Sequence, residues 1–343
     1  MSHTVDARQQ PDDPVHLAVP ELPKRILETY SRLWQLEIWL RRLIYVELSA
    51  LAADEWTTEV HGAEKPWEAD KRLTHMPTPE RDPLSYVQFS ELRRVISAQW
   101  QLFESFLPPQ SLWEAKLEEI VQIRHRVAHF RRGHQDDLQR VVQFLRDLDD
   151  GFWRFCTSYN DPQPVLPQSD DPVVANFLHL DPFAWGDVGD GKWARIGIAG
   201  PEVRFVVRIE VLCRPWARWA TPAAGHPGLL YDVTIHARHQ SHLEYRRLLE
   251  STSRLHKHVV HICLDSVAKS IRITIPTVLG AERVIPIVEQ FYEASLYCLV
   301  AGLSQQSDHA VQAFSDTWPS YVLGPENPLT FLSPDMPCSF FGV

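Results

Sequence analysis

The hydrophobic residues of this chain change their period once, and this change limits the fold more than any other feature of the sequence. Between residues 24 and 158 apolar side chains recur every three or four positions, as they do in amphipathic helices. After residue 194 apolar and polar side chains alternate, as they do in half-buried strands. The 343 residues, 44% of them apolar, are enough for two such units. The sequence therefore predicts an α + (α+β) chain with the helical unit first.

The first unit is predicted to be a four-helix bundle. Its helices are expected over residues 24–53, 84–106, 111–133 and 136–156. The third helix begins at a capping box, Ser111-x-x-Glu114, and is expected to end near Gly133, because glycine favours helix C-termini. The second unit is predicted to be a largely antiparallel sheet with one long helix, over residues 281–303, on one face.

These patterns divide the chain into four segments. They are a flexible arm over residues 1–22, a helical bundle over 23–160, a linker rich in proline and aspartate over 161–193, and an α+β domain with an irregular tail over 194–343. The strands of the last segment are expected over residues 194–199, 203–211, 231–238, 258–264 and 271–275.

Composition argues against several classes of protein. A net charge of −10 gives no global basic field that would attract nucleic acid. The five cysteines are scattered and include no Cys-x-x-Cys pair, which argues against a disulfide framework and a cysteine zinc site. No apolar run approaches the ~18 residues of a membrane span, and the first residues lack the apolar core of a secretory signal. A cytoplasmic protein with no membrane partner is therefore expected.

The densest cluster of candidate catalytic side chains lies in residues 120–132. Arg124 falls on the apolar stripe of its predicted helix, where a guanidinium is costly to bury without a partner. His125 and His129 are four positions apart and share a helix face beside it. Glu47, on the apolar stripe of the first helix, is either the carboxylate partner of Arg124 or a glutamate at the edge of that stripe.

Arg124-His125-x-x-x-His129 on the third helix resembles the Arg-(polar)-x4–6-His signature of HEPN domains (higher eukaryotes and prokaryotes nucleotide-binding). The stretch Ile123-Arg-His-Arg-Val-Ala-His129 is similar to the Ile-Arg-Asn-x-Val-Ala-His form of bacterial members, and the first-helix text from Tyr30 to Leu48 strengthens the likeness. The resemblance covers residues 24–158, under half of the chain.

Many HEPN proteins are endoribonucleases that need neither metal nor cofactor, and they act in bacterial defence and toxin-type growth arrest. The resemblance implies that Arg124 holds the scissile phosphate and that His129 moves protons during attack by the RNA 2′-OH, which leaves a 2′,3′-cyclic phosphate. It implies that His125 orients the phosphate or His129. It also implies a homodimer whose two motifs face one cleft, with an antitoxin or another regulatory partner.

Two other interpretations of the motif stay open: a catalytically inactive HEPN module that binds RNA or a partner, and a structural ion pair. Arg126, Arg131 and Arg132 are candidates for contacts with the RNA backbone, or else a solvated face. A metal site at the two histidines is disfavoured because no Glu follows His125.

The spacing of the motif and the polar side of the sheet raise two further expectations. Five positions separate Arg124 from His129 by about 7.5 Å along a helix and ~140° around it. A long Arg side chain, a kink or a second subunit must therefore bring them together. In the sheet, alternation predicts a basic face that could recognise RNA or a ligand, or simply be solvated; its members are Arg204, Arg208, His236, Arg238 and Arg272.

Overall fold

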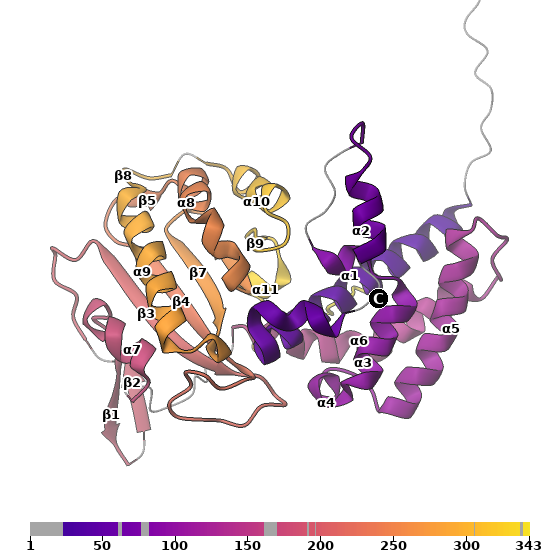
Figure 1. Ribbon diagram of the computed structural model, residues 1–343, viewed down its shortest axis with the longest axis horizontal. Coiled ribbons are helices and arrows are strands. Elements are labelled where there is room, and N and C mark those ends of the chain that lie inside the picture. The colour runs from indigo at the N-terminus through magenta and orange to yellow at the C-terminus, as the bar shows by residue number, and fades with distance from the viewer. Residues whose placement is uncertain are drawn as a thin grey trace, which may run out of the picture.

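A computed structural model combines a group of helices with a sheet-containing unit, as the sequence predicts (Figure 1). It describes residues 23–60, 64–76, 82–160, 170–190, 192–195, 197–304, 306–336 and 339–343. The predicted flexible arm over residues 1–22 lies outside the described residues. Among the helices that are described, none is both long enough and apolar enough to cross a membrane.

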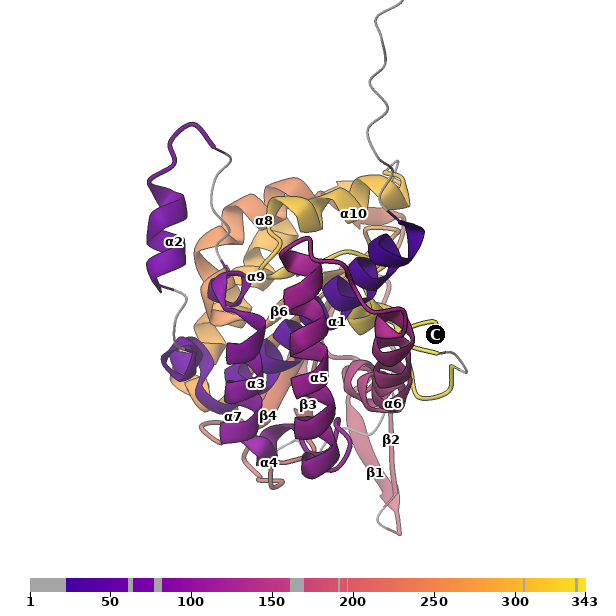
Figure 2. The same cartoon turned by 90° about the vertical axis from the view of Figure 1, so that its right-hand side faces the viewer.

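Four helices pack together in the first unit, around a core of leucine, isoleucine and phenylalanine side chains (Figure 2). They are α1 (Lys24–Ala52), α3 (Phe89–Ala98), α5 (Gln110–Ala128) and α6 (Asp137–Thr157). The predicted limits of the first and fourth helices are confirmed to within one residue. Both helices carry regular apolar stripes, so their burial follows directly from the sequence pattern.

The second predicted helix, over residues 84–106, is wrong as a single element. Val87 and Gln88 have extended backbones and Gln99 leaves helical geometry, so the segment is divided into three pieces. These are the short 3-10 helix η2 (Pro83–Tyr86), α3 and α4 (Trp100–Phe103). The predicted connection before it also holds structure, the 3-10 helix η1 (Ala53–Glu59) and α2 (Glu64–Lys71).

The predicted end of the third helix at Gly133 is also wrong. Helix α5 ends at Ala128, and Phe130 adopts a left-handed backbone with φ of 53°. The backbone N–H groups of Phe130 and Arg131 donate to the carbonyls of Val127 and Arg126 at 3.1 and 2.9 Å, which satisfies the helix end. At the other end the N-cap is Pro109, without a side-chain bond, so the predicted capping box does not form.

Between the two units, the described residues from 170 to 195 are docked on the sheet unit. They form α7 (Pro172–Phe177), the 3-10 helix η3 (Leu178–Leu180) and the hairpin of β1 (Trp185–Gly189) and β2 (Lys192–Arg195). The buried Asp171 carboxylate accepts hydrogen bonds from Val173 and Val174 at the start of α7, and from Ala223 and the Tyr231 hydroxyl of the sheet unit. One carboxylate therefore both caps α7 and attaches it.

The sheet has five strands in the order β3-β4-β7-β6-β9, with β9 parallel to β6 and the other neighbours antiparallel. The strands are β3 (Phe205–Cys213), β4 (Leu229–Ala237), β7 (Ser270–Pro276), β6 (His261–Leu264) and β9 (Val322–Leu323). The prediction of a largely antiparallel sheet is confirmed. Its edge strand β9 lies in the segment predicted to be an irregular tail, and only its pairing with β6 reveals it.

Helix α9 (Ala281–Tyr297) covers one face of the sheet and buries the alternating apolar side chains of β3, β4 and β7. It ends six residues before the predicted limit, because Leu299–Ala301 forms β8 and pairs with β5 (Ser241–Leu243). The remaining elements surround the sheet. They are α8 (Tyr245–Thr252), η4 (Ser253–His258), η5 (Thr277–Leu279), α10 (Asp308–Thr317) and α11 (Pro328–Phe331).

The second face of the sheet packs partly against α1, so the helical core continues into the sheet unit. Leu212 and Leu230 belong to the same apolar cluster as the leucines of α1. The Tyr45 hydroxyl donates to the Val260 carbonyl at 2.9 Å, and Arg42 bonds the ring of His261 at 2.8 Å. The last residues also return to the helices, where Asp149 of α6 accepts from the backbone of residues 340 and 341. The two units therefore share one interior.

Candidate functional site

The three motif residues lie at the C-terminal end of α5. Arg124 is partly exposed, with 33% of its side chain accessible, and both histidines are exposed. His129 is the first residue after the helix. The rings of His125 and His129 are parallel with their centroids 6.1 Å apart, as their four-residue spacing predicts. Two imidazoles and one guanidinium are thus presented together at one helix end.

Arg124 is held from α1. Its Nε lies 3.8 Å from Oε2 of Glu37. The other carboxylate oxygen of Glu37, Oε1, accepts a hydrogen bond from Arg41 at 2.6 Å. The Glu37 side chain is mostly buried, so the pair is partly shielded from water. The predicted carboxylate partner of Arg124 therefore exists, but it is Glu37. The sequence offers one signal for a charged group on this face of the first helix: Glu37 and Arg41 are four positions apart, a spacing that favours an ion pair.

Glu47 is not the partner of Arg124, and this part of the sequence prediction is wrong. Its buried carboxylate accepts from Arg214 Nε at 3.2 and 3.1 Å and from the Trp216 indole at 2.7 Å. All of these partners come from the segment after β3, more than 160 positions away. The sequence pattern of α1 correctly places Glu47 on the buried face but cannot name a partner so far along the chain.

Arg126 is also committed elsewhere. Its guanidinium binds the buried carboxylate of Asp137, with Nε at 3.2 Å from Oδ2, and the same oxygen accepts from the His134 backbone at 2.8 Å. Arg126 thus fastens the turn between α5 and α6 and is not free for an RNA phosphate. Arg131 and Arg132 are exposed on this turn and stay available as candidates for that contact.

One copy of the chain does not join Arg124 to either histidine. Within the described residues, no hydrogen bond or ion pair links the guanidinium to His125 or His129. No group of three or more His, Cys, Asp or Glu side chains able to hold a metal ion occurs among the described residues.

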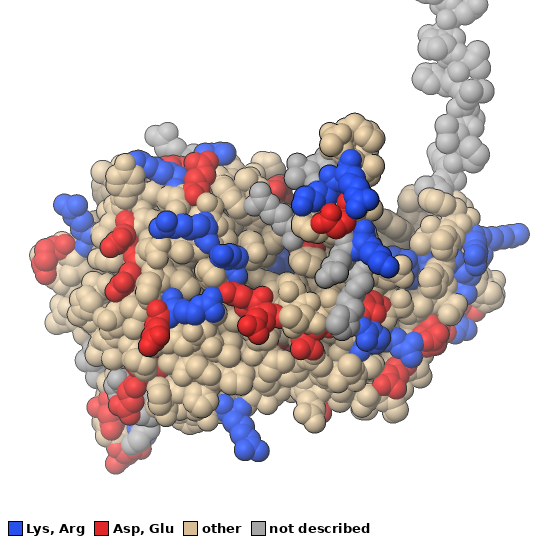
Figure 3. Space-filling model, viewed as in Figure 1, with Lys and Arg blue, Asp and Glu red and all other residues tan. Residues whose placement is uncertain are grey.

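The surface near the motif carries several exposed apolar side chains. Leu27, Tyr30 and Trp34 of α1 have exposed fractions of 48%, 56% and 59%, and Phe130 has 93%. Arg25 of α1 donates to the Gln135 carbonyl, so the first turns of α1 lie beside the turn that follows the motif. Elsewhere, on the face in Figure 3, basic and acidic side chains are interspersed. The motif end thus presents exposed apolar side chains beside the exposed Arg131 and Arg132.

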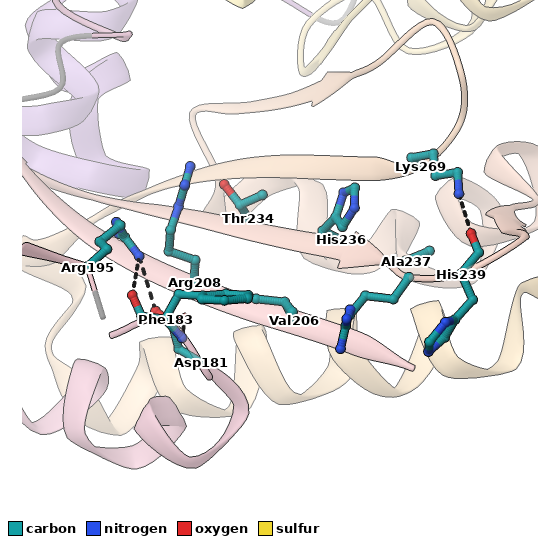
Figure 4. Close-up of a pocket in the computed structure, with 11 residues that line it drawn as sticks. Asp181, Phe183, Arg195, Val206, Arg208, Thr234, His236, Ala237, His239 and Lys269 are labelled. Atoms are coloured by element: carbon teal, nitrogen blue, oxygen red, sulfur yellow. Dashed lines mark hydrogen bonds and ion pairs between the residues drawn. The ribbon is translucent and has the colours of Figure 1, made fainter. Parts of the chain in front are cut away.

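Of the five basic side chains predicted to share one face of the sheet, the strand register places Arg208, His236 and Arg272 on the same face, but that face is not open throughout. Arg272 is turned inward, where its Nη2 donates to the Leu329 carbonyl at 2.8 Å and its Nε lies 3.5 Å from Asp232. Arg204 precedes β3 and is exposed. The other three, Arg208, His236 and Arg238, line a cavity of about 690 Å³ at the end of the sheet that α1 leaves uncovered (Figure 4).

This cavity is lined by residues of the sheet unit and of the segment before it, and it is distinct from the motif end of α5. The molecule therefore presents two candidate sites, an exposed Arg/His cluster on the helical unit and an open basic cavity on the sheet. Comparison of the chain with known protein families, curated proteins and solved structures finds no match.

Proposed function

We propose that this chain is a metal-independent endoribonuclease of the HEPN type that cuts RNA by attack of a 2′-OH on the adjacent phosphate. The observation that carries the proposal is the exposed end of α5, where Arg124 and two parallel imidazoles lie together. A guanidinium binds phosphate oxygens through paired N–H donors and offsets the negative charge that grows in the transition state. Imidazole exchanges protons near neutral pH, as this attack requires.

The roles divide among three residues. Arg124 would hold the scissile phosphate, and His129 would take the proton from the 2′-OH or give one to the leaving 5′-oxygen. His125, parallel to His129, would orient the phosphate or its neighbouring imidazole. Arg131 and Arg132, exposed on the turn after the motif, would bind phosphates on either side of the cut. The product would carry a 2′,3′-cyclic phosphate.

A second copy of the chain would complete the site. Two observations support a homodimer: among the described residues Arg124 pairs with Glu37 and forms no hydrogen bond or ion pair with His125 or His129, and Phe130 and several apolar side chains of α1 are exposed. Tyrosine, tryptophan and phenylalanine are enriched in protein interfaces because they bury a large area at low entropic cost. A two-fold axis at this end would bring the Arg124 of one copy toward the His129 of the other.

The test is cleavage of total RNA by the purified protein in EDTA. Wild type should cut, and Arg124→Ala and His129→Ala should each lower the rate by at least about a hundredfold. Arg146→Ala on α6 and His309→Ala on α10 are matched controls, because both residues are exposed and lie outside the motif. Cleavage that persists in both motif variants would remove Arg124 and His129 from the mechanism.

A second candidate is an inactive HEPN module that holds RNA or a regulatory partner without cutting. Among the described residues, Arg124 forms no hydrogen bond or ion pair with either histidine, which favours this alternative. It predicts that the wild-type protein retains RNA in a gel-shift experiment, leaves it intact, and loses binding when Arg131 and Arg132 are changed to alanine.

A further inference from the structure

The cavity on the sheet is built around one guanidinium without a close partner. Arg208 lies at the middle of β3, opposite Thr234 of β4. Its Nε is buried and forms no hydrogen bond with the described residues, and its nearest carboxylate, Glu210, is 3.9 Å away. Glu210 is already bonded by Arg195. A buried N–H donor that lacks an acceptor is costly, so this position favours an anionic ligand.

The neighbouring groups complete a polar floor. The Thr234 hydroxyl is buried and also has no hydrogen-bond partner among the described residues. Figure 4 shows Arg208, Thr234 and His236 projecting to the same side of the sheet. Burial lowers the pKa of His236, so its imidazole is neutral at pH 7 and can accept as well as donate a hydrogen bond. Three side chains on two paired strands thus converge on one space.

The other cations around the cavity are already engaged. Arg195 donates to Asp181 and to the Phe183 carbonyl, and Arg238 donates to the Gly200 carbonyl at 3.1 Å. Lys269 binds the His239 carbonyl. These four basic residues, counting Arg208, face two carboxylates, Asp181 of the lining and Glu210 beside Arg195 and Arg208, while the chain as a whole has a net charge of −10. The cavity is therefore a local positive field in an acidic protein.

An aromatic ring stands at the rim of the same cavity. Phe183 has 38% of its surface exposed, and Val206 adds an apolar contact on β3. The segment that carries Phe183 is fixed closely against Gly197, where an added Cβ would meet the Pro182 carbonyl oxygen at 1.6 Å. The backbone that carries the ring is therefore held in place, and the ring offers a flat apolar surface in the lining of the cavity.

A second hollow of about 360 Å³ adjoins the first, and it shares Arg208 and Thr234 with the larger cavity. Arg208 therefore lies between two spaces. A cavity of several hundred Å³ with a few convergent polar groups has the size of a small-molecule site. The larger hollow alone is enough for one nucleoside, and the shared Arg208 stands where a phosphate would join it.

We propose that this cavity binds a nucleotide, with the phosphate on Arg208 and Thr234 and the base against Phe183. Guanidinium recognises phosphate through charge-assisted hydrogen bonds, and aromatic side chains stack on bases of any sequence. The site lies on the sheet unit and involves none of the motif residues of α5. The proposal therefore stands whether or not the motif cuts RNA.

The test is isothermal titration of the full chain with AMP, adenosine and inorganic phosphate. AMP should bind more tightly than adenosine or phosphate alone, because only AMP reaches both Arg208 and Phe183. Arg208→Ala should weaken AMP binding at least about tenfold, and Thr234→Val and Phe183→Ala should each weaken it by a smaller factor. Arg204→Ala is the matched control, since Arg204 precedes the same strand but does not line the cavity.

Thermal unfolding of each variant shows whether the fold is retained. Absence of AMP binding by the wild-type protein at millimolar concentration would overturn the proposal. It would also be overturned if Arg208→Ala, still folded, bound AMP as wild type does, or if phosphate alone bound as tightly as AMP. None of these readouts uses RNA cleavage, so their failure is distinct from failure of the proposed nuclease.

Discussion

Glu47 and Arg214 form a buried ion pair that joins the helical unit to the sheet unit. Their side chains are 0% and 1% exposed, and Arg214 Nε lies 3.2 and 3.1 Å from the two carboxylate oxygens. Arg214 Nη1 also donates to the Ser158 hydroxyl at 2.8 Å, just beyond α6. Burial acts to lower the pKa of Arg214, but the Glu47 carboxylate outweighs it and the net shift is upward. The Arg214 guanidinium therefore stays charged in the interior.

Removal of either partner should destabilise the whole chain. Arg214→Ala or Glu47→Ala leaves one uncompensated buried charge, which costs about 3–5 kcal/mol. Urea unfolding measures the change. Glu91→Ala is the control, because Glu91 pairs with the exposed Arg94 within α3, where such pairs contribute less than about 1 kcal/mol. Equal losses for Glu47→Ala and Glu91→Ala would contradict a buried pair.

Protonation of His261 in acid should weaken the contact between α1 and the sheet. Arg42 has no acceptor, so the bond at 2.8 Å requires that His261 Nε2 accept and that the ring be neutral. Burial first, then Arg42 and Arg272, lowers the pKa of His261 well below its ordinary value of 6.5. The unfolded chain therefore binds one more proton, and this contribution to stability is lost as pH falls below about 6.5.

His261→Gln keeps an acceptor but removes the titration. We expect its free energy of unfolding to depend less on pH than that of wild type as pH falls below about 6.5. Asp232 acts in the opposite direction, because burial raises its pKa to about 6 and its contribution is lost as pH rises through that value. The difference between the variant and wild type cancels this effect. An unchanged pH dependence would show that His261 is not the responsible group.

Replacement of Phe130 by glycine should raise the stability of the chain but weaken the proposed dimer. Its left-handed backbone costs a non-glycine residue roughly 1–2 kcal/mol, and its ring is 93% exposed, so it gains little from burial. Phe130→Gly should therefore stabilise the chain by about 1 kcal/mol in urea unfolding, while Phe130→Ala should not. If Phe130 serves the proposed dimer, the glycine variant should dissociate at higher concentration in analytical ultracentrifugation. A variant that dimerises as wild type does would exclude that role.

Glu37 should act on cleavage through Arg124. Glu37→Gln keeps the shape of the side chain but releases the guanidinium, and we expect a fall in kcat of about tenfold from lost positioning. Stability should change by less than about 1 kcal/mol, and Glu37→Asp should recover part of the rate. Glu118→Gln, which breaks an exposed pair between α5 and α3, is the control. A loss of stability without a change in kcat would make Glu37 purely structural.

Local patterns predicted those elements whose burial repeats along the chain. Helices α1 and α6 have unbroken periods of 3.6, and their limits follow from this period. The alternation of β3, β4 and β7 predicted these strands to within two residues at each end, but the strand predicted to begin at residue 258 begins at His261, and the one predicted over 194–199 overlaps only β2 of the separate hairpin. The end of α5 was not predictable, because it depends on a left-handed Phe130 and on Asp137 binding Arg126 across the turn. Strand β9 was missed because two residues carry no period and pair only with β6.

The residues of the candidate sites were likewise predictable only where they are close together in the sequence. The Arg124, His125 and His129 cluster is visible in the sequence because its residues are adjacent on one helix. Glu37 and the partners of Glu47 are contributed by distant segments, so spacing alone does not identify them. The inward turn of Arg272 depends on the carbonyl of Leu329, which lies 57 positions away. Alternation assigns a side chain to a face of the sheet, but tertiary packing decides whether that face is open.

The most direct test of the central claim is whether two different inactive chains restore one active site. Arg124→Ala and His129→Ala carry different tags, are co-expressed and are assayed together on RNA in EDTA. If each site takes Arg124 from one copy and His129 from the other, half of the dimers are mixed and each keeps one intact site. The pair should then regain about a quarter of the wild-type rate, with 2′,3′-cyclic phosphate ends. A pair that stays as inactive as each variant alone would contradict the composite site.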